Sequence, residues 1–405
     1  MAPTQAALYR DVKIASRGPS GPGHRLDRQM AGRTQAALYS EIDLDLSWSE
    51  QQLPQVERTK HVHGLHPYLG KFIPQLVDVF LRRYFRPGDH VYDPFVGSGT
   101  TLVEASAFGA SGIGCDISAF NCLLTGVKTA EYSVGVLEMA LRATYEESRQ
   151  IEPRIDLGHA SEWLHRWYAP KALRELLAYR VAAIELDDPI REVAHVILSR
   201  SARSARLTTH FDLDFPRQPA TEPYYCHKHK RTCVPVGEAG KFLRRYSTDT
   251  SQRIRAFAGV RSRTESIVLH EDSRTVRLPK KPSGIITSPP YPGLIDYHEQ
   301  HRYAYELLGL VDRRLEEIGS ASKGTGRSAL REYQSGMVGV FLNASEQMDH
   351  GSPVVIVVND SRNLYPEILD RSGLQLEDVL TRHVNRRTGR RVGEFYENVL
   401  VCRVA

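Results

Sequence analysis

Four consecutive residues, Ser288-Pro289-Pro290-Tyr291, combine a small hydroxyl, two prolines and an aromatic ring. They directly follow Gly284-Ile285-Ile286, a run that is typical of a short buried strand. Proline has a fixed φ and no amide N–H, so a Pro-Pro pair holds its carbonyl oxygens in place and leaves them free to accept. Such a site can accept hydrogen bonds from an amino group and stack a planar base. A Pro-Pro pair alone would indicate only a turn.

A second stretch, Asp93 to Thr101, places two glycines between a predicted strand and a predicted helix. Glycines there let the backbone approach a ligand closely, and the helix that follows presents free N–H groups. Asp116 follows about 20 residues later, where an acid bonds ribose hydroxyls in nucleoside-binding α/β folds. The chain has no Gly-x4-Gly-Lys-Ser/Thr motif, which excludes a P-loop that grips phosphates.

The elements that must position these residues form a strand–helix–strand unit of a parallel sheet. The predicted helices are 72–84 and 100–108, and the predicted strands are 90–93, 111–117, 266–269, 284–287, 353–358 and 398–404. Between the early and late strands, residues 135–200 have a helical pattern and residues 207–250 an irregular one. The sequence therefore predicts an α/β domain that is split by a long insert.

These residues together resemble the S-adenosylmethionine-dependent DNA methyltransferases that methylate the amino groups of bases. Asp93 to Thr101 is similar to the family's cofactor loop. Ser288 to Tyr291 is similar to its catalytic tetrapeptide, in the form typical of cytosine-N4 enzymes. His66 to Pro74 resembles the segment at the methionine end of the cofactor, and Asp272-Ser273-Arg274 resembles the loop beside the adenine. The resemblance covers more than half of the chain.

The resemblance implies a Rossmann-like methyltransferase fold with a mainly parallel twisted sheet, split by a largely helical or irregular insert. It implies S-adenosylmethionine as the cofactor, duplex DNA as the substrate and a cognate restriction endonuclease as a candidate partner. The cofactor-binding residues that it implies are His66, Tyr68, Lys71, Asp93, Pro94, Phe95, Gly97, Gly99, Thr100, Thr101, Asp116, Ile117 and Asp272. The catalytic residues that it implies are Ser288, Pro289, Pro290 and Tyr291. Because the cofactor loop comes first, the permuted order of many cytosine-N4 enzymes is excluded.

The exocyclic amine of cytosine is a poor nucleophile, because its lone pair is delocalised into the ring. Ser288 Oγ and the Pro289 carbonyl would accept its two hydrogens and localise that lone pair. Tyr291 would stack on the base, which must be flipped out of the duplex. Serine at 288, where adenine enzymes usually carry Asp or Asn, favours cytosine-N4 over adenine-N6 methylation.

Three other functions compete with this hypothesis. An RNA amino-methyltransferase shares the Pro-Pro-Tyr site, and a catalytically inactive nucleic-acid-binding module would keep the basic insert. Carbon-5 methylation needs a cysteine that follows a proline, and none of the five cysteines does. The triplet Glu397-Asn398-Val399 resembles a motif of the carbon-5 methyltransferases, but this likeness is interpreted as a coincidence.

Positive charge is concentrated in one part of a nearly balanced chain. The whole chain has 53 Lys and Arg against 48 Asp and Glu, whereas residues 200–265 have 14 against 6. A cofactor-binding core with one flipped base cannot read several base pairs, so the insert is expected to recognise the target. The residues expected to contact nucleic acid are Lys228, Lys230, Arg231, Arg244 and Arg245, and the arginine-rich stretch 382–391 is a second candidate.

Cys226, His229 and Cys233 have the types of zinc ligands. Three clear ligands are one short of a closed structural site, so the sequence favours a basic loop, and no metal is expected. Few and odd-numbered cysteines fit a reducing compartment, and a cytoplasmic location is expected. No apolar run approaches the length of about 18 residues that spans a bilayer, so no membrane partner is expected.

The chain is expected to divide into four parts. Residues 1–45 contain a near-duplicated segment around a Gly/Pro/Ser-rich linker and are predicted to be a mobile tail, with Met30 as an alternative start. Residues 46–130 are the predicted cofactor-binding half, 131–265 the basic insert and 266–405 the catalytic half. The oligomeric state is left open.

Overall fold

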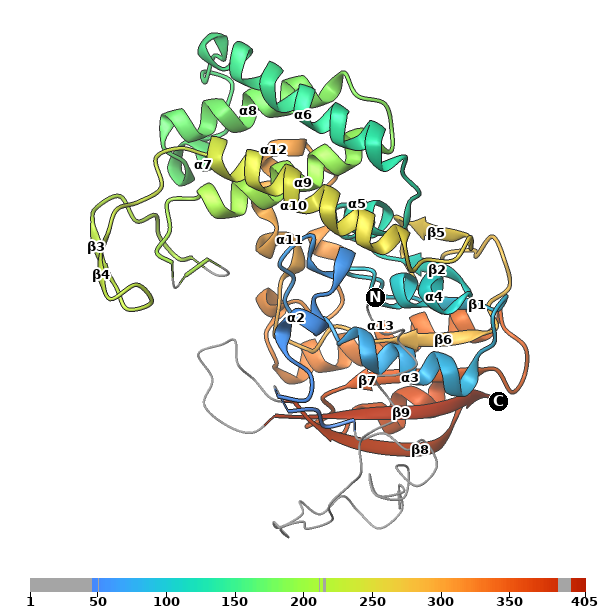
Figure 1. The fold of residues 1–405 in the computed structure, drawn as a ribbon. Coiled ribbons are helices and arrows are strands. Elements are labelled where there is room, and N and C mark those ends of the chain that lie inside the picture. The colour runs from blue at the N-terminus through green and yellow to red at the C-terminus, as the bar shows by residue number, and fades with distance from the viewer. Residues whose placement is uncertain (1–45, 50, 211, 214–215, 385–394) are drawn as a thin grey trace. The chain divides into compact units, whose positions relative to one another are not determined.

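A seven-stranded sheet with the order β5-β2-β1-β6-β7-β9-β8 forms the centre of the computed structural model (Figure 1). Its strands are β1 (His90–Asp93), β2 (Ser111–Cys115), β5 (Ser266–Leu269), β6 (Gly284–Thr287), β7 (Pro353–Val358), β8 (Leu374–His383) and β9 (Tyr396–Val404). All of them run parallel except β9, which is antiparallel to both of its neighbours. This topology confirms the predicted Rossmann-like methyltransferase fold.

The structure describes residues 46–49, 51–210, 212–213, 216–384 and 395–405. The duplicated segment predicted in residues 1–45 lies outside the described residues. So does most of the arginine-rich stretch 382–391, of which only residues 382–384 are described.

The central strand β7 is buried on both faces of the sheet, and its successive residues point to opposite sides. In β7, Val354, Ile356 and Val358 pack into the core on one face, whereas Val355 and Val357 pack into the core on the other. Every residue of this strand is buried. A central strand buried on both sides explains why its sequence is a continuous apolar run.

Helices cover the two faces of the sheet. Helices α3 (Pro74–Tyr84) and α4 (Thr100–Phe108) contribute to the core on one face, and α13 (Arg327–Ser345) and α14 (Tyr365–Arg371) to the core on the other. Helix α5 (Ala119–Thr129) lies at the β5 end. Short helices complete the framework: α2 (Gln55–Arg58), α11 (Tyr297–Gln300), α12 (Arg302–Leu308) and the 3-10 turns η2 (His61–Gly64), η4 (Arg314–Glu316) and η5 (Ala321–Lys323).

Residues between α5 and β5 form a helical layer, which Figure 1 shows beyond the β5 edge of the sheet. It consists of α6 (Val134–Ile151), η3 (Glu152–Arg154), α7 (Glu162–Trp167), α8 (Pro170–Ile184), α9 (Ile190–Ala205) and α10 (Gly240–Ala258). A short hairpin, β3 (Tyr224–Cys226) and β4 (Arg231–Cys233), lies between α9 and α10. The layer shares one continuous hydrophobic core with α5 and α12, so it is packed onto the sheet domain.

Most predicted elements match the structure. The strands at 90–93, 266–269, 284–287 and 353–358 and the helix at 100–108 have the predicted bounds. The irregular segment predicted for 207–250 is wrong for its last part, because α10 begins at Gly240. Strand β8 was not predicted; it is an edge strand with a bulge between Leu376 and Asp378, which breaks the alternating pattern.

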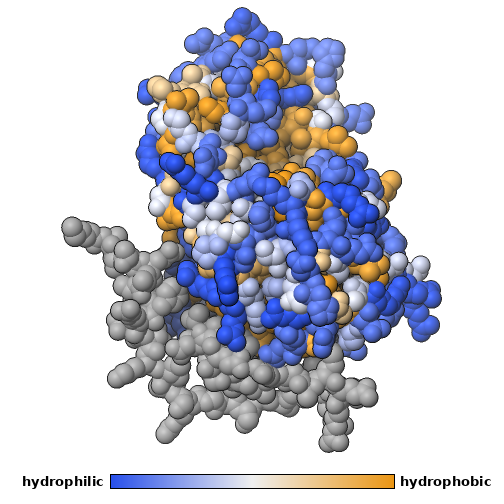
Figure 2. Space-filling view, turned by 90° about the vertical axis from the view of Figure 1, so that its right-hand side faces the viewer, coloured by the Kyte–Doolittle hydropathy of each residue, from blue (hydrophilic) through white to orange (hydrophobic). Residues whose placement is uncertain are grey.

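Figure 2 shows the side of the molecule that lies to the right in Figure 1. That face is mostly hydrophilic, with apolar patches mainly over its upper part. Scattered exposed apolar residues of this kind are normal for a globular protein. Among the described residues, no helix is both long and apolar enough to cross a membrane.

Candidate functional site

One cavity opens at the carboxyl ends of β1, β2, β5 and β6 and has a volume of about 830 Å³, counting its open mouth. The predicted site residues that line it are Tyr68, Lys71, Pro94, Phe95, Gly97, Thr100, Asp116, Ile117, Asp272, Ser288 and Pro290. The fold therefore brings both sequence motifs to one cavity. Ligands of open α/β sheets bind at this edge of the sheet.

The glycine loop lets the backbone form part of the cavity wall. Gly97 has a φ of 48° and Gly99 a φ of 77°, values that side chains rarely tolerate. A Cβ on Gly97 would lie 3.0 Å from the Tyr68 hydroxyl. Beneath the loop, the buried Lys128 donates from Nζ to the Ser98 carbonyl at 2.5 Å. The result is a narrow cradle that a larger residue would fill.

Asp116 is fixed at the end of β2 by three donors. Its carboxylate accepts the Gly97 N–H at 2.9 Å, the Ser118 N–H at 2.9 Å and the Asn121 side-chain amide at 3.1 Å. Burial raises the pKa of Asp116 against the effect of these hydrogen bonds. The carboxylate is thus held rigidly at the cavity wall, where it can accept hydroxyl donors from a ligand.

The segment before α3 supplies a cation to the cavity. Lys71 Nζ donates to the His63 carbonyl at 2.9 Å and lines the cavity. Burial, and then the nearby positive charge of Arg253, lowers the pKa of Lys71 to about 8. The Tyr68 ring stacks on Tyr297 with 5.6 Å between ring centroids. The sequence thus places one titratable positive charge beside an aromatic wall.

Asp272 lines the cavity after β5 and is held by its neighbour Arg274. The Arg274 guanidinium donates to both carboxylate oxygens, from Nε at 2.9 Å and from Nη2 at 2.6 Å. Burial alone would raise the pKa of Asp272, but these hydrogen bonds lower it. The carboxylate therefore stays an acceptor.

Asp93 lies beneath the cavity and joins the two motifs. Its carboxylate accepts the Thr101 hydroxyl at 2.7 Å, the Thr287 hydroxyl at 2.6 Å and the Phe95 N–H at 3.1 Å. Because Thr287 immediately precedes Ser288, one buried carboxylate ties β1, α4 and the tetrapeptide together. Burial raises the pKa of Asp93 to about 6, although the hydrogen bonds oppose this.

Hydrogen bonds to neighbouring strands and helices fix the acceptor groups of the tetrapeptide Ser288–Tyr291. The Ser288 hydroxyl donates to the Val357 carbonyl at 3.0 Å, so its oxygen lone pairs remain. The Pro290 carbonyl accepts the buried Tyr333 hydroxyl at 3.0 Å. Within the described residues, the Pro289 carbonyl has no hydrogen-bond donor. Ser288 Oγ lines the cavity and is available to an incoming amine, whereas Pro289 is buried and does not line the cavity.

Tyr291 faces a second cavity, which it lines with Tyr333, Asp360 and Phe395. The Tyr291 hydroxyl donates to Glu397 at 3.1 Å. Burial, and then the charge of Glu397, raises the pKa of Tyr291 well above its usual value, so it remains a donor. The tetrapeptide thus contributes residues to two cavities.

Glu397 is in turn bound by Arg382, whose Nε lies 3.3 Å from the carboxylate. Arg382 is buried, so its guanidinium supports the tetrapeptide. The expectation that it belongs to a phosphate-contacting loop is wrong for this residue. Glu397 therefore contacts the tetrapeptide through Tyr291 and is itself held by Arg382.

His66 does not line the cavity and is corrected to a packing residue. It is buried, its ring packs edge-on against Phe120, and Nδ1 lies 2.7 Å from the Pro67 carbonyl. A carbonyl only accepts, so Nδ1 carries the proton and Nε2 accepts from the Ser199 hydroxyl at 3.2 Å. Other predicted residues that support the cavity without lining it are Asp93, Gly99, Thr101, Pro289 and Tyr291.

Several other residues line the cavity. Gly70, Phe72, Val96, Ser98 and Ser273 lie within the predicted segments, and Tyr297 was expected in the base pocket. The unpredicted ones are Ser118, Asn121, Glu316, Glu317, Ile318 and Val340. Glu317 is the least expected, because it comes from a loop after α12. It is buried and accepts the His298 backbone N–H at 2.9 Å and also contacts His298 Nδ1. Tyr297 follows the tetrapeptide closely in the sequence, and Asn121 follows Asp116. No nearby motif identifies Glu317 as a site residue.

The residues predicted to contact nucleic acid are all exposed: Lys228, Lys230, Arg231, Arg244 and Arg245. Other basic residues of the segment 200–265 form ion pairs with acidic residues of the protein itself. Arg200 and Arg253 both bind Asp249, and Arg255 binds Glu138. The positive charge available to a partner is therefore smaller than the charge count of this segment suggests.

Comparisons with known proteins identify relatives of this chain. A family model described as a DNA methylase matches residues 29–125. The chain is 37% identical over 444 residues to the Type II methyltransferase M.MjaII of Methanocaldococcus jannaschii, covering 89% of this chain and 83% of that protein. It is 37% identical over 82 residues to the Type II methyltransferase M.MvaI of Kocuria varians, covering 20% and 18%.

Among solved structures, the chain is similar to the rRNA methyltransferase aviRa from Streptomyces viridochromogenes. The TM-score is 0.32 at 10% sequence identity, covering 84% of this chain and 89% of that chain.

Proposed function

The chain belongs to the family of DNA methylases that transfer a methyl group from S-adenosylmethionine to amino groups of bases, and from this premise we propose that its target is the N4 amine of cytosine in duplex DNA. The observation that carries the proposal is the arrangement at Ser288. A serine stands where the adenine enzymes of the family usually carry Asp or Asn, and its hydroxyl hydrogen is engaged by Val357. The oxygen is therefore a pure acceptor for an amine.

The first cavity fits S-adenosylmethionine. Gly97 lines the cavity at a point where a Cβ would meet the Tyr68 hydroxyl, and the held carboxylate of Asp116 suits the ribose hydroxyls. Asp272 would lie beside the adenine, and Lys71 beside the carboxylate of the methionine end. Bound there, S-adenosylmethionine supplies an electrophilic methyl group on a sulfonium.

The second cavity suits the flipped base. Tyr291, whose ring is fixed through its hydroxyl by Glu397, would stack on it. Ser288 Oγ, which lines the first cavity, and the Pro289 carbonyl, which has no donor among the described residues, would accept the two amine hydrogens. That pairing withdraws the nitrogen lone pair from the ring and directs it toward the first cavity. Positioning and hydrogen bonding thereby lower the barrier without a covalent intermediate.

Nucleoside analysis tests the target base. The purified chain is incubated with genomic DNA and isotopically methyl-labelled S-adenosylmethionine, and the hydrolysed nucleosides are separated by mass spectrometry. Labelled N4-methylcytosine is the expected product. Labelled N6-methyladenine without N4-methylcytosine would refute the proposal, and label found only in parallel samples of structured RNA would move the substrate to RNA.

The charge of Lys71 gives a pH-dependent affinity for the cofactor. Lys71 is positive below a pKa of about 8 and loses its charge above it, so the affinity is expected to fall as the pH rises through 8. A charge-assisted hydrogen bond contributes about 1.5–3 kcal/mol, so Lys71→Met should weaken binding about tenfold or more at pH 7. Calorimetry from pH 6.5 to 9.5 measures both effects.

The α-amino group of the cofactor itself titrates near pH 8. Lys71→Met removes only the protein's contribution, and Lys71→Arg keeps a positive charge at every pH. A wild-type pH profile that is unchanged in both variants would contradict the role of Lys71.

We also propose that DNA contacts the exposed start of α10. Arg244 and Arg245 are exposed there, and among the described residues neither has an acidic partner. Each phosphate contact contributes about 0.9 to the slope of log affinity against log salt. Replacing both with alanine should lower that slope by about 2 and weaken binding up to about 60-fold at 0.1 M salt.

Fluorescence anisotropy with labelled duplex between 50 and 300 mM salt measures this slope. The matched control is Arg142→Ala with Arg149→Ala, two exposed arginines of α6 in the same helical layer. An unchanged slope in the α10 variant would remove these residues from the DNA interface.

A restriction endonuclease is the partner we propose, because the relatives of this chain are named Type II methyltransferases. DNA methylated by the chain should resist an extract of the host cells that cleaves the unmethylated DNA. Equal cleavage of methylated and unmethylated DNA would contradict a partner endonuclease and indicate a solitary methyltransferase.

A further inference from the structure

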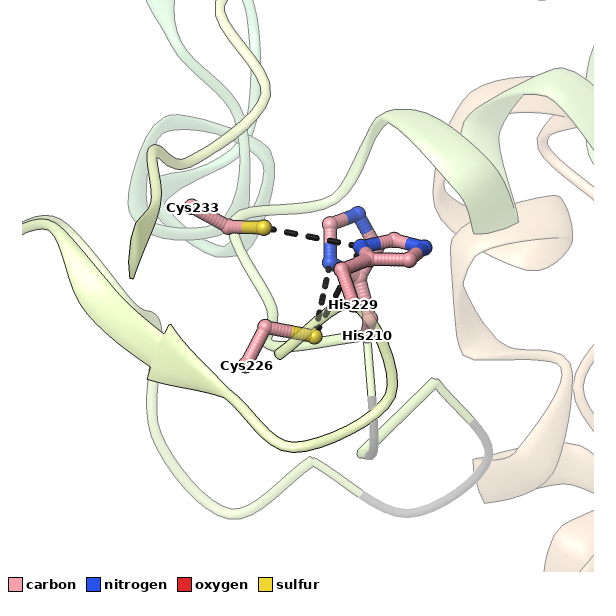
Figure 3. Close-up of side chains that lie close together, drawn as sticks. All are labelled: His210, Cys226, His229 and Cys233. Carbon is pink, nitrogen blue, oxygen red and sulfur yellow. Dashed lines mark hydrogen bonds between the residues drawn. The ribbon is translucent and has the colours of Figure 1, made fainter. Parts of the chain in front are cut away.

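Four potential metal ligands converge beside the β3–β4 hairpin. His210 comes from the segment after α9, Cys226 and Cys233 end the two strands, and His229 lies in the turn between them (Figure 3). One ligand atom of each lies within 4.8 Å of the others. Figure 3 shows that the four side chains point toward one common centre.

Three of the ligand-to-ligand distances match those of a tetrahedral site. Cys226 Sγ lies 3.6 Å from His210 Nδ1 and 3.6 Å from His229 Nδ1, and Cys233 Sγ lies 3.5 Å from His229 Nδ1. Ligands about 2.0–2.3 Å from a tetrahedral zinc ion stand about 3.3–3.8 Å from one another. We propose that His210, Cys226, His229 and Cys233 bind one structural zinc ion.

The sequence alone offered only three of these ligands. Cys226, His229 and Cys233 form a compact run, and His210 stands 16 positions before Cys226 with no motif that links it to them. The fold supplies the fourth ligand. Two thiolates also neutralise the charge of Zn²⁺, so the positive charges of Lys228 and Lys230 on the turn remain available to phosphates.

The hairpin needs a cross-link, because it has almost no core of its own. From residue 216 to residue 238, the buried side chains are those of Cys226 and Cys233 alone. Each strand has three residues, and a two-stranded hairpin of that size is marginal in water. In so small a unit, metal binding supplies folding free energy that apolar burial cannot.

Tyr224 supplies a supporting contact. Its hydroxyl lies 3.0 Å from both the backbone N–H and Nδ1 of His210. In the metal-free protein the hydroxyl can donate to Nδ1, and with zinc on Nδ1 it keeps its bond to the backbone N–H. Hydrogen-bonded partners of this kind orient metal ligands.

A second group, His61, His63 and Glu104, is explained without an ion. His63 Nε2 lies 2.7 Å from Glu104, and Lys60 Nζ lies 3.5 Å from the same carboxylate. The Lys60 ammonium and the His63 ring nitrogen already compensate the buried carboxylate. The hairpin cluster differs, because its sulfur atoms lie at hydrogen-bond distance from the imidazole rings with which they would share a metal.

Metal analysis of the full chain tests the proposal. The protein is expressed with zinc in the medium, purified under reducing conditions without chelators, and measured by plasma mass spectrometry. One zinc ion per chain is expected. Exchange into cobalt(II) should give the visible bands of a tetrahedral site and a thiolate charge-transfer band in the near ultraviolet.

Variants locate the ion. Cys233→Ala and His210→Ala should each lose most of the zinc, whereas His227→Ala, an exposed histidine of the same turn, and Cys122→Ala should keep one ion per chain. Retained affinity for S-adenosylmethionine shows that the sheet domain is folded in every variant. Zinc-free wild-type protein with no cobalt spectrum, or full zinc in the Cys226→Ala, Cys233→Ala double variant, would overturn the proposal. Neither result depends on methylation, so the proposed function is tested separately.

Discussion

Replacing Ser288 with alanine is expected to lower kcat for methyl transfer about 100- to 1,000-fold, because it removes an acceptor that acts on the reacting amine. The serine hydroxyl is already engaged by the Val357 carbonyl, so its role toward the base is to accept. Affinity for S-adenosylmethionine should change less than about twofold, since the other residues of the first cavity remain. Single-turnover kinetics with saturating cofactor and duplex measure the chemical step.

Ser288→Asn provides the matched comparison. The asparagine side chain keeps an acceptor oxygen, so this variant should lose less activity than Ser288→Ala. If alanine lowers kcat less than threefold, the hydroxyl is not an acceptor in the reaction. If alanine and asparagine are equally inactive, steric fit at this position outweighs hydrogen bonding.

The second large effect concerns stability and pH, and it arises from Asp93. The native pKa of about 6 exceeds the ordinary value of 3.8, so between about pH 4 and 6 the folded chain holds a proton that the unfolded chain releases. The free energy of unfolding contributed by Asp93 therefore falls as the pH rises through this window. A difference of about 2 in pKa corresponds to about 3 kcal/mol, fully expressed above pH 6.

Urea denaturation of wild type and Asp93→Asn at pH 4.5 and pH 7 isolates this effect. The two proteins share all other titratable groups. From pH 4.5 to pH 7, the difference between their free energies of unfolding should therefore change by about 2–3 kcal/mol in favour of the variant. Asp370→Asn, an exposed carboxylate, is the control and should show no such shift. Equal pH dependence of wild type and Asp93→Asn would contradict the assignment.

Local signals were enough to predict the sheet and both motifs. A strand such as Pro353–Val358 is a continuous apolar run because it is buried on both faces, and glycines or prolines end several of the others. Strand β8 lacked such a signal. It lies at the edge, where charged residues such as Glu377 are accepted.

What the sequence could not give were contacts between distant segments. His66 lies in a stretch that resembles a cofactor-binding segment, but its ring bonds Ser199, 133 positions away. Lys128 looks like an ordinary helix lysine, yet its amine is buried under the glycine loop. Glu317 in the cavity wall and His210 in the hairpin cluster could not be predicted for the same reason. Only the fold brings each of them next to the other residues of its site.

Arg253 links helix α10, which carries the proposed DNA contacts, to the segment that leads into the first cavity. It lies on α10, whose start exposes the proposed DNA contacts, and its Nη1 donates to the carbonyls of Thr59 and His61 at 3.0 Å each. It also fills the space beside Gly64, where a Cβ would lie 2.1 Å from Nη1. These carbonyls belong to the segment that leads directly to Lys71 in the first cavity.

With DNA bound at the proposed contacts, a shift of α10 would move the segment that leads to Lys71, and the two ligands would then be thermodynamically linked. The factor by which DNA changes the affinity for S-adenosylmethionine must equal the factor by which S-adenosylmethionine changes the affinity for DNA. The recognised sequence would then set both where the protein binds and how firmly it holds the methyl donor. Most of a genome must stay unmodified, and such reciprocity would concentrate loaded enzyme at its targets.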